Sequence, residues 1–302
     1  MKKRLLIGLA VLLLLAGVAV WLEPTGVVLG WLHGEAFYRN RPTRYWETAL
    51  TDADPKRQVD AHQQLKDGGR AAVPVLAQLL RSGRVEARWR AADLLGQMRA
   101  DARDAAPALV QALGDSDPHV RAVAATGLVA IGPAGPEAIP ALRDLLDSDN
   151  VVPALRALAR YGDKAAAVVP RAIELLHDED SEVRWNAART LGKIGPAAKD
   201  AVPALRAAMH DGEALVREHA AEALGDIGPE AKDAVPDLIV ALKDPDPRVR
   251  RDAVRSLGQI GPEANSAVEA IRPLLKDKDA KVRKAAVVSL KQVEKSATGK
   301  VE

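Results

Sequence analysis

The sequence predicts an all-α superhelix of stacked helical hairpins, preceded by one hydrophobic helix. Three observations lead to this prediction. Of the 302 residues 48% are hydrophobic but only 3% are aromatic, so the core must be aliphatic, which favours helices over strands. From about residue 70 onward, prolines and arginines recur at a nearly constant spacing. Near the N-terminus lies a long apolar run that contains no charge.

The apolar run extends from Leu5 to Leu22, directly after the basic residues Lys2 to Arg4. As a helix it measures about 27 Å, which nearly spans a bilayer core and favours a single-pass signal anchor over residues 1–22. A cleaved signal peptide is the alternative, because Gly17 to Ala19 offers a small-x-small cleavage site. The basic cluster predicts a solenoid on the extracytoplasmic, periplasmic side of a bacterial membrane. Cleavage would instead give a secreted or soluble periplasmic form.

Residues 23–44 form a predicted aromatic juxtamembrane segment. Six of the nine aromatic residues lie between positions 21 and 46. We expect Trp31 to lie at the membrane interface, whereas Tyr45 and Trp46 are expected to cover the end of the solenoid. Residues 45–69 are interpreted as an N-terminal capping hairpin, with its turn at Asp54 and Pro55.

Two ladders of residues define the repeat. A proline opens each unit, at a spacing of 33 residues with one interval of 30, and Glu269 replaces it in the last unit: Pro74, Pro107, Pro140, Pro170, Pro203 and Pro236. Fourteen residues after the opening position, every unit except the one begun by Pro140 carries an arginine: Arg88, Arg121, Arg184, Arg217, Arg250 and Arg283. Two ladders in register indicate a repeat architecture.

Each unit is predicted to contain two helices, called helix A and helix B. The proline suits the first turn of helix A, and Asp246 and Pro247 illustrate the turn that ends helix A and caps helix B. Glycine followed by proline, as at Gly261, ends helix B. Because such a hairpin is apolar on one side only, neighbouring hairpins must stack to bury a continuous core.

The motif V-R-x-x-A-x-x-x-L-G-x-I-G-P recurs at residues 183–196 and 249–262. It resembles the HEAT-repeat superfamily, especially the short phycobilisome-lyase-type HEAT-like repeats. The resemblance covers about seven repeats over residues 70–294, followed by a polar tail at 295–302. It implies an α-solenoid that serves as a scaffold and binding surface.

The resemblance also implies that the arginines are structural. Acidic and arginine residues at the start of helix B would form a ladder between neighbouring repeats. Because the members of each pair are four residues apart, pairing within one helix is the alternative. The expected pairs are Asp117 with Arg121, Asp180 with Arg184, Asp246 with Arg250 and Asp279 with Arg283.

The sequence contains few motifs that indicate catalysis or metal binding. It contains no cysteine, no nucleophile or phosphate-binding motif, and only the reversed dipeptide Glu218-His219 in place of the His-Glu pairs of HEAT-type hydroxylases. We therefore predict no catalytic residue, metal or cofactor. The net charge is only +2, and the basic residues Arg251, Arg255 and Lys284 are interpreted as a solvated face, so no nucleic acid is expected as a partner.

The sequence thus predicts a non-enzymatic, membrane-tethered scaffold for protein–protein interaction outside the cytoplasm. The alternatives are a HEAT-like enzyme or accessory module of the bilin-lyase or hydroxylase kind, and a nucleic-acid-binding array. The predicted partner-binding residues are Trp89 and Asp93 in one repeat and Trp185 and Arg189 in another. Both indoles are expected to be largely exposed, unless each ring lies flat against the neighbouring helix B. The partner's identity, the oligomeric state and the binding face stay open.

Overall fold

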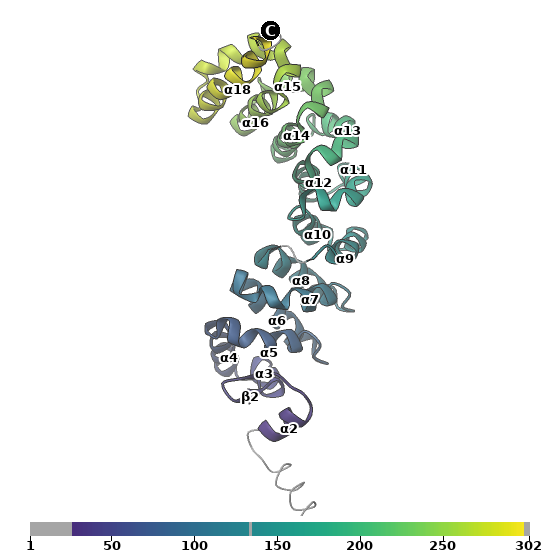
Figure 1. Cartoon of the computed structure of the whole chain (residues 1–302), viewed down its shortest axis with the longest axis vertical. Coiled ribbons are helices and arrows are strands. Elements are labelled where there is room, and N and C mark those ends of the chain that lie inside the picture. The colour runs from purple at the N-terminus through teal and green to yellow at the C-terminus, as the bar shows by residue number, and fades with distance from the viewer. Residues whose placement is uncertain (1–25, 133–134, 299–302) are drawn as a thin grey trace, which may run out of the picture. The chain divides into compact units, whose positions relative to one another are not determined.

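The computed structural model describes residues 26–132 and 135–298, which form two compact units on either side of the gap (Figure 1). Each unit is an array of helical hairpins, as the repeat predicts. The predicted membrane helix from Leu5 to Leu22 lies outside the described residues. Within those residues, no helix is both long and apolar enough to cross a bilayer.

The first unit begins with a short helix and a two-residue hairpin, followed by paired helices. Its elements are α2 (Val27–Leu32), β1 (Phe37–Tyr38), β2 (Arg41–Pro42), α3 (Thr43–Leu50), α4 (Pro55–Asp67), η1 (Gly69–Ala72), α5 (Val73–Leu79), α6 (Val85–Met98), η2 (Arg99–Ala105), α7 (Ala106–Ala112) and α8 (Pro118–Ile131). Helix α4 lies within the segment 45–69 interpreted as a capping hairpin, and α3 begins two residues before that segment.

Part of the predicted juxtamembrane segment packs on the helices that follow it. Strands β1 and β2 are joined by Arg39 and Asn40, which both have positive φ (49° and 54°), as a tight two-residue hairpin requires. The Tyr38 hydroxyl donates a hydrogen bond to the Gln64 carbonyl on α4 at 3.1 Å. The side chain of Gln78 on α5 bonds the backbone at both Gly34 and Ala36. These contacts fasten residues 34–42 to the array.

The second unit repeats the same hairpin with greater regularity. Its elements are α9 (Ala138–Asp144), η3 (Leu145–Asp147), α10 (Val151–Leu158), η4 (Gly162–Val168), α11 (Val169–Leu175), α12 (Ser181–Ile194), η5 (Gly195–Ala201), α13 (Val202–Ala208), α14 (Ala214–Ile227), η6 (Gly228–Ala234), α15 (Val235–Ala241), α16 (Pro247–Ile260), η7 (Gly261–Ala267), α17 (Val268–Ile271), η8 (Arg272–Lys276) and α18 (Ala280–Thr298). The A helices α11, α13 and α15 lie along one side of the row, and the B helices α12, α14 and α16 along the other (Figure 1).

Local chemistry sets the ends of the helices. The Asp246 carboxylate accepts a hydrogen bond from the Arg248 amide and caps α16, as predicted. Gly261 ends α16 at φ 75°, a conformation that L side chains rarely adopt. As predicted, the proline lies in the first turn of helix A; in α13 and α15 it is the second α-helical residue. A 3₁₀ helix that the sequence analysis did not predict precedes helix A, and it is kinked at Ala198 in η5 and at Ala231 in η6.

The core lies mainly between successive B helices. Leu191, Leu224 and Leu257 occupy equivalent positions and are fully buried. The first glycine of the L-G-x-I-G motif permits this close stacking: a Cβ atom on Gly225 would come within 2.8 Å of the Ser256 Cα. The Ser256 hydroxyl donates to the Ala221 carbonyl at 2.7 Å, so even a polar group in this interface is satisfied across it.

Candidate functional site

In all six predicted arginines, which we call the arginine ladder, Nη1 donates to the carbonyl six residues earlier, and four of them also pair with a carboxylate. Arg217 makes both contacts: Nε and Nη2 contact the Asp244 carboxylate of the next repeat at 2.8 and 3.2 Å, and Nη1 donates to the Asp211 carbonyl at 2.8 Å. The carboxylate pairing is seen for Arg88–Asp115, Arg184–Asp211, Arg217–Asp244 and Arg250–Asp277. The arginines thus link neighbouring repeats through two-pronged ion pairs.

The predicted acidic partners were wrong by two residues. Asp117, Asp180, Asp246 and Asp279 do not pair with the ladder arginines; each instead accepts a hydrogen bond from a backbone amide at the start of its own helix B. Their N-cap position directs the carboxylate toward the first helical turn. The aspartate two residues earlier faces the preceding repeat. Glu213, which stands at the equivalent position before α14, makes no side-chain cap bond.

Each ladder aspartate serves two repeats at once. Asp211 accepts Arg184 on its carboxylate, while its own carbonyl accepts Arg217. Hydrogen bonds consequently run without a break from Arg184 to Arg283 in the second unit. Burial opposes ionisation of Asp211, but the bonds from Arg184 and from the Glu213 amide outweigh it and lower the pKa of the carboxyl.

The ladder is interrupted once in the sequence. Arg121 bonds only the carbonyls of Asp115 and Ser116, and the residue 27 positions after it is Ser148, which carries no charge. At the next arginine position stands Val151. Both positions belong to one repeat, Ser148 in the turn before helix B and Val151 at its start, and this helix, α10, is the shortest B helix of the second unit.

The predicted binding residues lie on the solvent-facing side of the B helices. Trp89 and Asp93 belong to α6 in the first unit, and Trp185 and Arg189 belong to α12 in the second, so the structure brings each pair together but does not relate the two pairs. All four side chains are half-buried. Asp93 accepts a hydrogen bond from Gln97 at 2.8 Å, which orients it along its own helix.

The expectation of largely exposed indoles was wrong. The Trp185 ring stacks on His219 of α14, with centroids 5.1 Å apart and planes 24° apart, and the Arg156 guanidinium lies 5.5 Å from its centroid. Trp89 contacts His119 of α8 edge to face at 5.3 Å. Each indole is larger than the alanines of the B-helix interface, so it lies over the neighbouring helix instead of pointing into solvent.

A charged cluster that the sequence analysis missed continues from Trp185. His219 Nδ1 lies 3.1 Å from the Glu222 carboxylate, and Lys193 bridges Glu222 at 3.1 Å and Asp226 at 2.8 Å. The hydrogen bond with His219, aided by Lys193, lowers the pKa of Glu222 to about 2. The i, i+3 spacing of His219 and Glu222 is the signal that would have predicted the pair.

The residues interpreted as a solvated basic face also line a groove. It lies between α16 and α18 and has a volume of about 350 Å³. We call it the basic groove; its lining residues are Arg251, Arg255, Lys281, Lys284, Ala285 and Val288.

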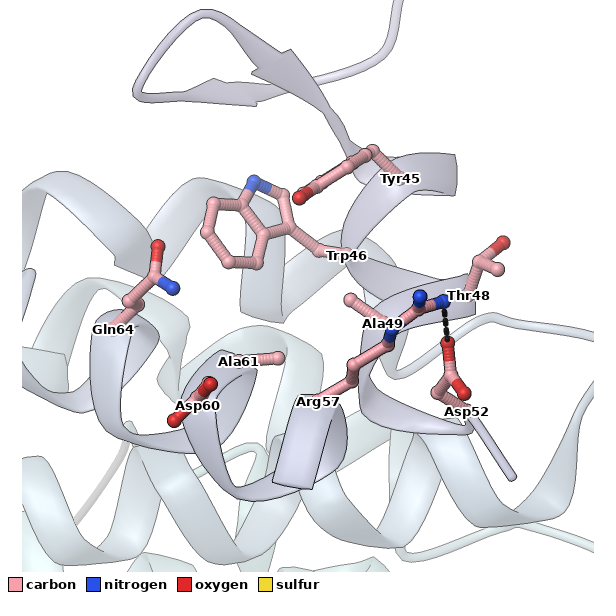
Figure 2. Close-up of a pocket in the computed structure, with 9 residues that line it drawn as sticks. All are labelled: Tyr45, Trp46, Thr48, Ala49, Asp52, Arg57, Asp60, Ala61 and Gln64. Atoms are coloured by element: carbon pink, nitrogen blue, oxygen red, sulfur yellow. Dashed lines mark ion pairs between the residues drawn. The ribbon is translucent and has the colours of Figure 1, made fainter. Parts of the chain in front are cut away.

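A second cavity, of about 430 Å³, opens between α3 and α4 (Figure 2). The indole of Trp46 reaches toward its centre, where it is 2% exposed and donates from Nε1 to the Tyr38 carbonyl at 3.3 Å. The pair of Arg57 with Asp52, 3.6 Å apart, stands at one end of the cavity (Figure 2). Among the described residues, no group of three or more histidines and carboxylates is placed to hold a metal ion.

Comparison with known proteins decides the family. The sequence profile of HEAT repeats matches residues 72–153, 152–225 and 235–300. The chain belongs to the HEAT-repeat family. The profile of the PBS lyase HEAT-like repeat also matches, at residues 216–244, which confirms the expected resemblance to the short repeats. A search of curated protein sequences finds no match.

Solved structures agree with the HEAT-repeat fold. The crystal structure of one engineered protein is 27% identical, with 83% of this chain and 78% of that chain covered and a TM-score of 0.60. A second engineered protein is 25% identical over 84% and 96% of the two chains, with a TM-score of 0.43. Human deoxyhypusine hydroxylase in complex with glycerol is 26% identical over 90% and 100%, with a TM-score of 0.36. The last two scores are too low to support an inference from those proteins.

The arginine ladder of these HEAT repeats makes a stability prediction. We expect Arg217→Ala to lower the free energy of unfolding by about 1 to 3 kcal/mol, because it leaves the 9%-exposed Asp244 carboxylate without its guanidinium. Urea denaturation measures the change. Arg283→Ala is the matched control, since Arg283 makes the carbonyl bonds but has no carboxylate partner among the described residues. Equal losses in the two variants would contradict a role for the inter-repeat ion pair.

The Glu222 cluster makes a prediction about pH. Because the pKa of Glu222 falls from 4.5 to about 2 on folding, its contribution to stability is present above pH 4.5 and is lost as the pH falls toward 2. Glu222→Gln should therefore flatten the dependence of unfolding free energy on pH in that window. Glu230→Gln, at an exposed position, is the control. An unchanged profile in the Glu222 variant would mean that the cluster does not form.

Proposed function

We propose that the chain is a membrane-tethered HEAT-repeat scaffold that binds a protein partner outside the cytoplasm, and that it is not an enzyme. The observation that carries this proposal is the outward stripe of the B helices in the second unit. At equivalent positions the stripe changes from Arg189 on α12 to Glu222 on α14 and Arg255 on α16, while the buried leucines Leu191, Leu224 and Leu257 stay the same. A constant core beneath a varied surface is typical of repeat proteins that recognise partners.

Trp185 and Arg189 are the proposed contacts in the second unit, and Trp89 and Asp93 those in the first. Half-burial suits this role, because a ring fixed against a neighbouring histidine loses little conformational entropy when a partner covers its remaining surface. The stacking on His219 therefore orients the Trp185 edge instead of removing it from the surface.

The proposed tether is the apolar run from Leu5 to Leu22. Support comes from α2, which follows that run closely and exposes Trp31 by 74% and Leu32 by 61%. An exposed indole beside an exposed leucine on a short helix suits the headgroup region of a bilayer. In the proposed topology, Lys2 to Arg4 stay inside and the HEAT repeats lie in the bacterial periplasm.

The absence of cysteine from the sequence permits one experiment that tests both location and binding. Single cysteines are introduced by Arg189→Cys on the B side and by Val240→Cys on the A side, where Val240 is 63% exposed. Each full-length variant is labelled, in cells with a permeable outer membrane, with a photo-crosslinking maleimide that cannot cross the inner membrane. We expect both sites to be labelled and a partner to be crosslinked from position 189 only.

The two parts of the proposal fail separately. Labelling that requires lysis of the inner membrane would overturn the extracytoplasmic location. Labelling without lysis, followed by equal crosslinking from positions 189 and 240 or by none from either, would overturn the B-helix stripe as the binding face.

A further inference from the structure

The basic groove between α16 and α18 is the C-terminal end of the outward stripe. Arg251 and Arg255 of α16 form one wall, and Lys281 and Lys284 of α18 form the other. Between them the floor is apolar: Ala285 is buried, and Val288 is 49% exposed. An apolar floor enclosed by four cations differs from an ordinary solvated helix face, whose cations alternate with acids.

Buried carboxylates hold the arginine wall in place. Asp252, whose side chain is 3% exposed, contacts Arg251 at 2.6 Å and Arg255 at 3.2 Å. Glu218 of α14 contacts Arg251 at 3.1 Å. The hydrogen bond with Asp252 raises the pKa of Arg251, so this guanidinium is charged at every working pH. The arginines are thus fixed in position before any ligand arrives.

The lysine wall has the opposite character. Lys281 and Lys284 are exposed, and no carboxylate within the described ranges 26–132 and 135–298 pairs with either ammonium group. The two buried acids, Asp252 and Glu218, already pair with the arginines. The groove therefore carries an excess of positive charge, located on the α18 side of an exposed valine.

We propose that the basic groove binds a short acidic segment of a protein partner, in which carboxylates meet Lys281 and Lys284 and one apolar side chain packs on Val288. The positive charge of the groove favours an acidic ligand. Val288 on its floor is an apolar surface that only a segment with an apolar side chain would cover. This proposal rests on the proposed scaffold function and specifies the chemistry of the partner.

The distribution of charge along the B helices favours a peptide over a nucleic acid as the ligand of the basic groove. A duplex needs basic side chains on several successive helices. On α14, the positions equivalent to Arg251 and Arg255 are the acidic residues Glu218 and Glu222, so the row of basic side chains does not continue onto that helix. The positive surface is therefore confined to α16 and α18, which matches a short segment.

The test uses the full-length protein in detergent micelles and a short fluorescent peptide with one central leucine between glutamates. We expect Lys281→Glu combined with Lys284→Glu to weaken its binding by more than about tenfold, measured by fluorescence anisotropy. The charge-matched control is Lys232→Glu combined with Lys276→Glu, at exposed positions on η6 and η8, and should bind as the unaltered protein does. Val288→Asp should also weaken binding.

Three results would overturn the proposal. The first is no binding of the peptide to the unaltered protein, and the second is equal weakening by the control pair. The third is binding of a random DNA duplex that is stronger than peptide binding and equally sensitive to Lys281 and Lys284, which would assign the groove to nucleic acid. Crosslinking from position 189 is independent of these results, so failure of the groove would leave the proposed scaffold standing.

Discussion

Every described hairpin depends on its neighbours, because its apolar stripe has no other surface to bury itself against. The B helices meet this requirement by close approach, which small residues such as Gly225 allow, and by burying leucines such as Leu224. Apolar contact alone would allow neighbouring hairpins to slide along each other. The arginine ladder adds direction, since a guanidinium such as that of Arg217 must meet a carboxylate in the next repeat and a carbonyl in the turn before its own helix. Stacking thus supplies stability, and the ladder fixes the register.

The same constraint separates structure from recognition within each B helix. One side is confined to small and aliphatic residues, whereas the other faces solvent and is free to vary. In the second unit this freedom yields an aromatic position at Trp185, an acidic one at Glu222 and a basic one at Arg255. Side chains such as His219 connect one position to the next, so the stripe is a surface with fixed side chains and not a set of isolated residues. A partner would meet different chemistry at each repeat.

The sequence predicts the fold well, because the repeat displays the same local rules many times. Hairpins, caps and the ladder arginines all follow from spacing. What it could not predict depends on packing between repeats. Arg217 pairs with Asp244 and not with the capping residue Asp246. The path of the turn before α16 determines which of these two carboxylates reaches the guanidinium. The stacking of Trp185 on His219 and the basic groove likewise require knowing how far apart two helices lie. The 3₁₀ helices were missed because Gly-Pro marks the end of helix B, and the spacing does not show that helical structure resumes directly after it.

The claim that each repeat is coupled to its nearest neighbours is tested most directly by hydrogen exchange on Leu224→Ala. Leu224 is fully buried in α14, so the cavity should destabilise that helix by about 2 to 5 kcal/mol. Protection should fall in α14 and in the adjoining α12 and α16, while the outer parts of the second unit keep theirs. Uniform loss of protection over residues 135–298 would contradict the account.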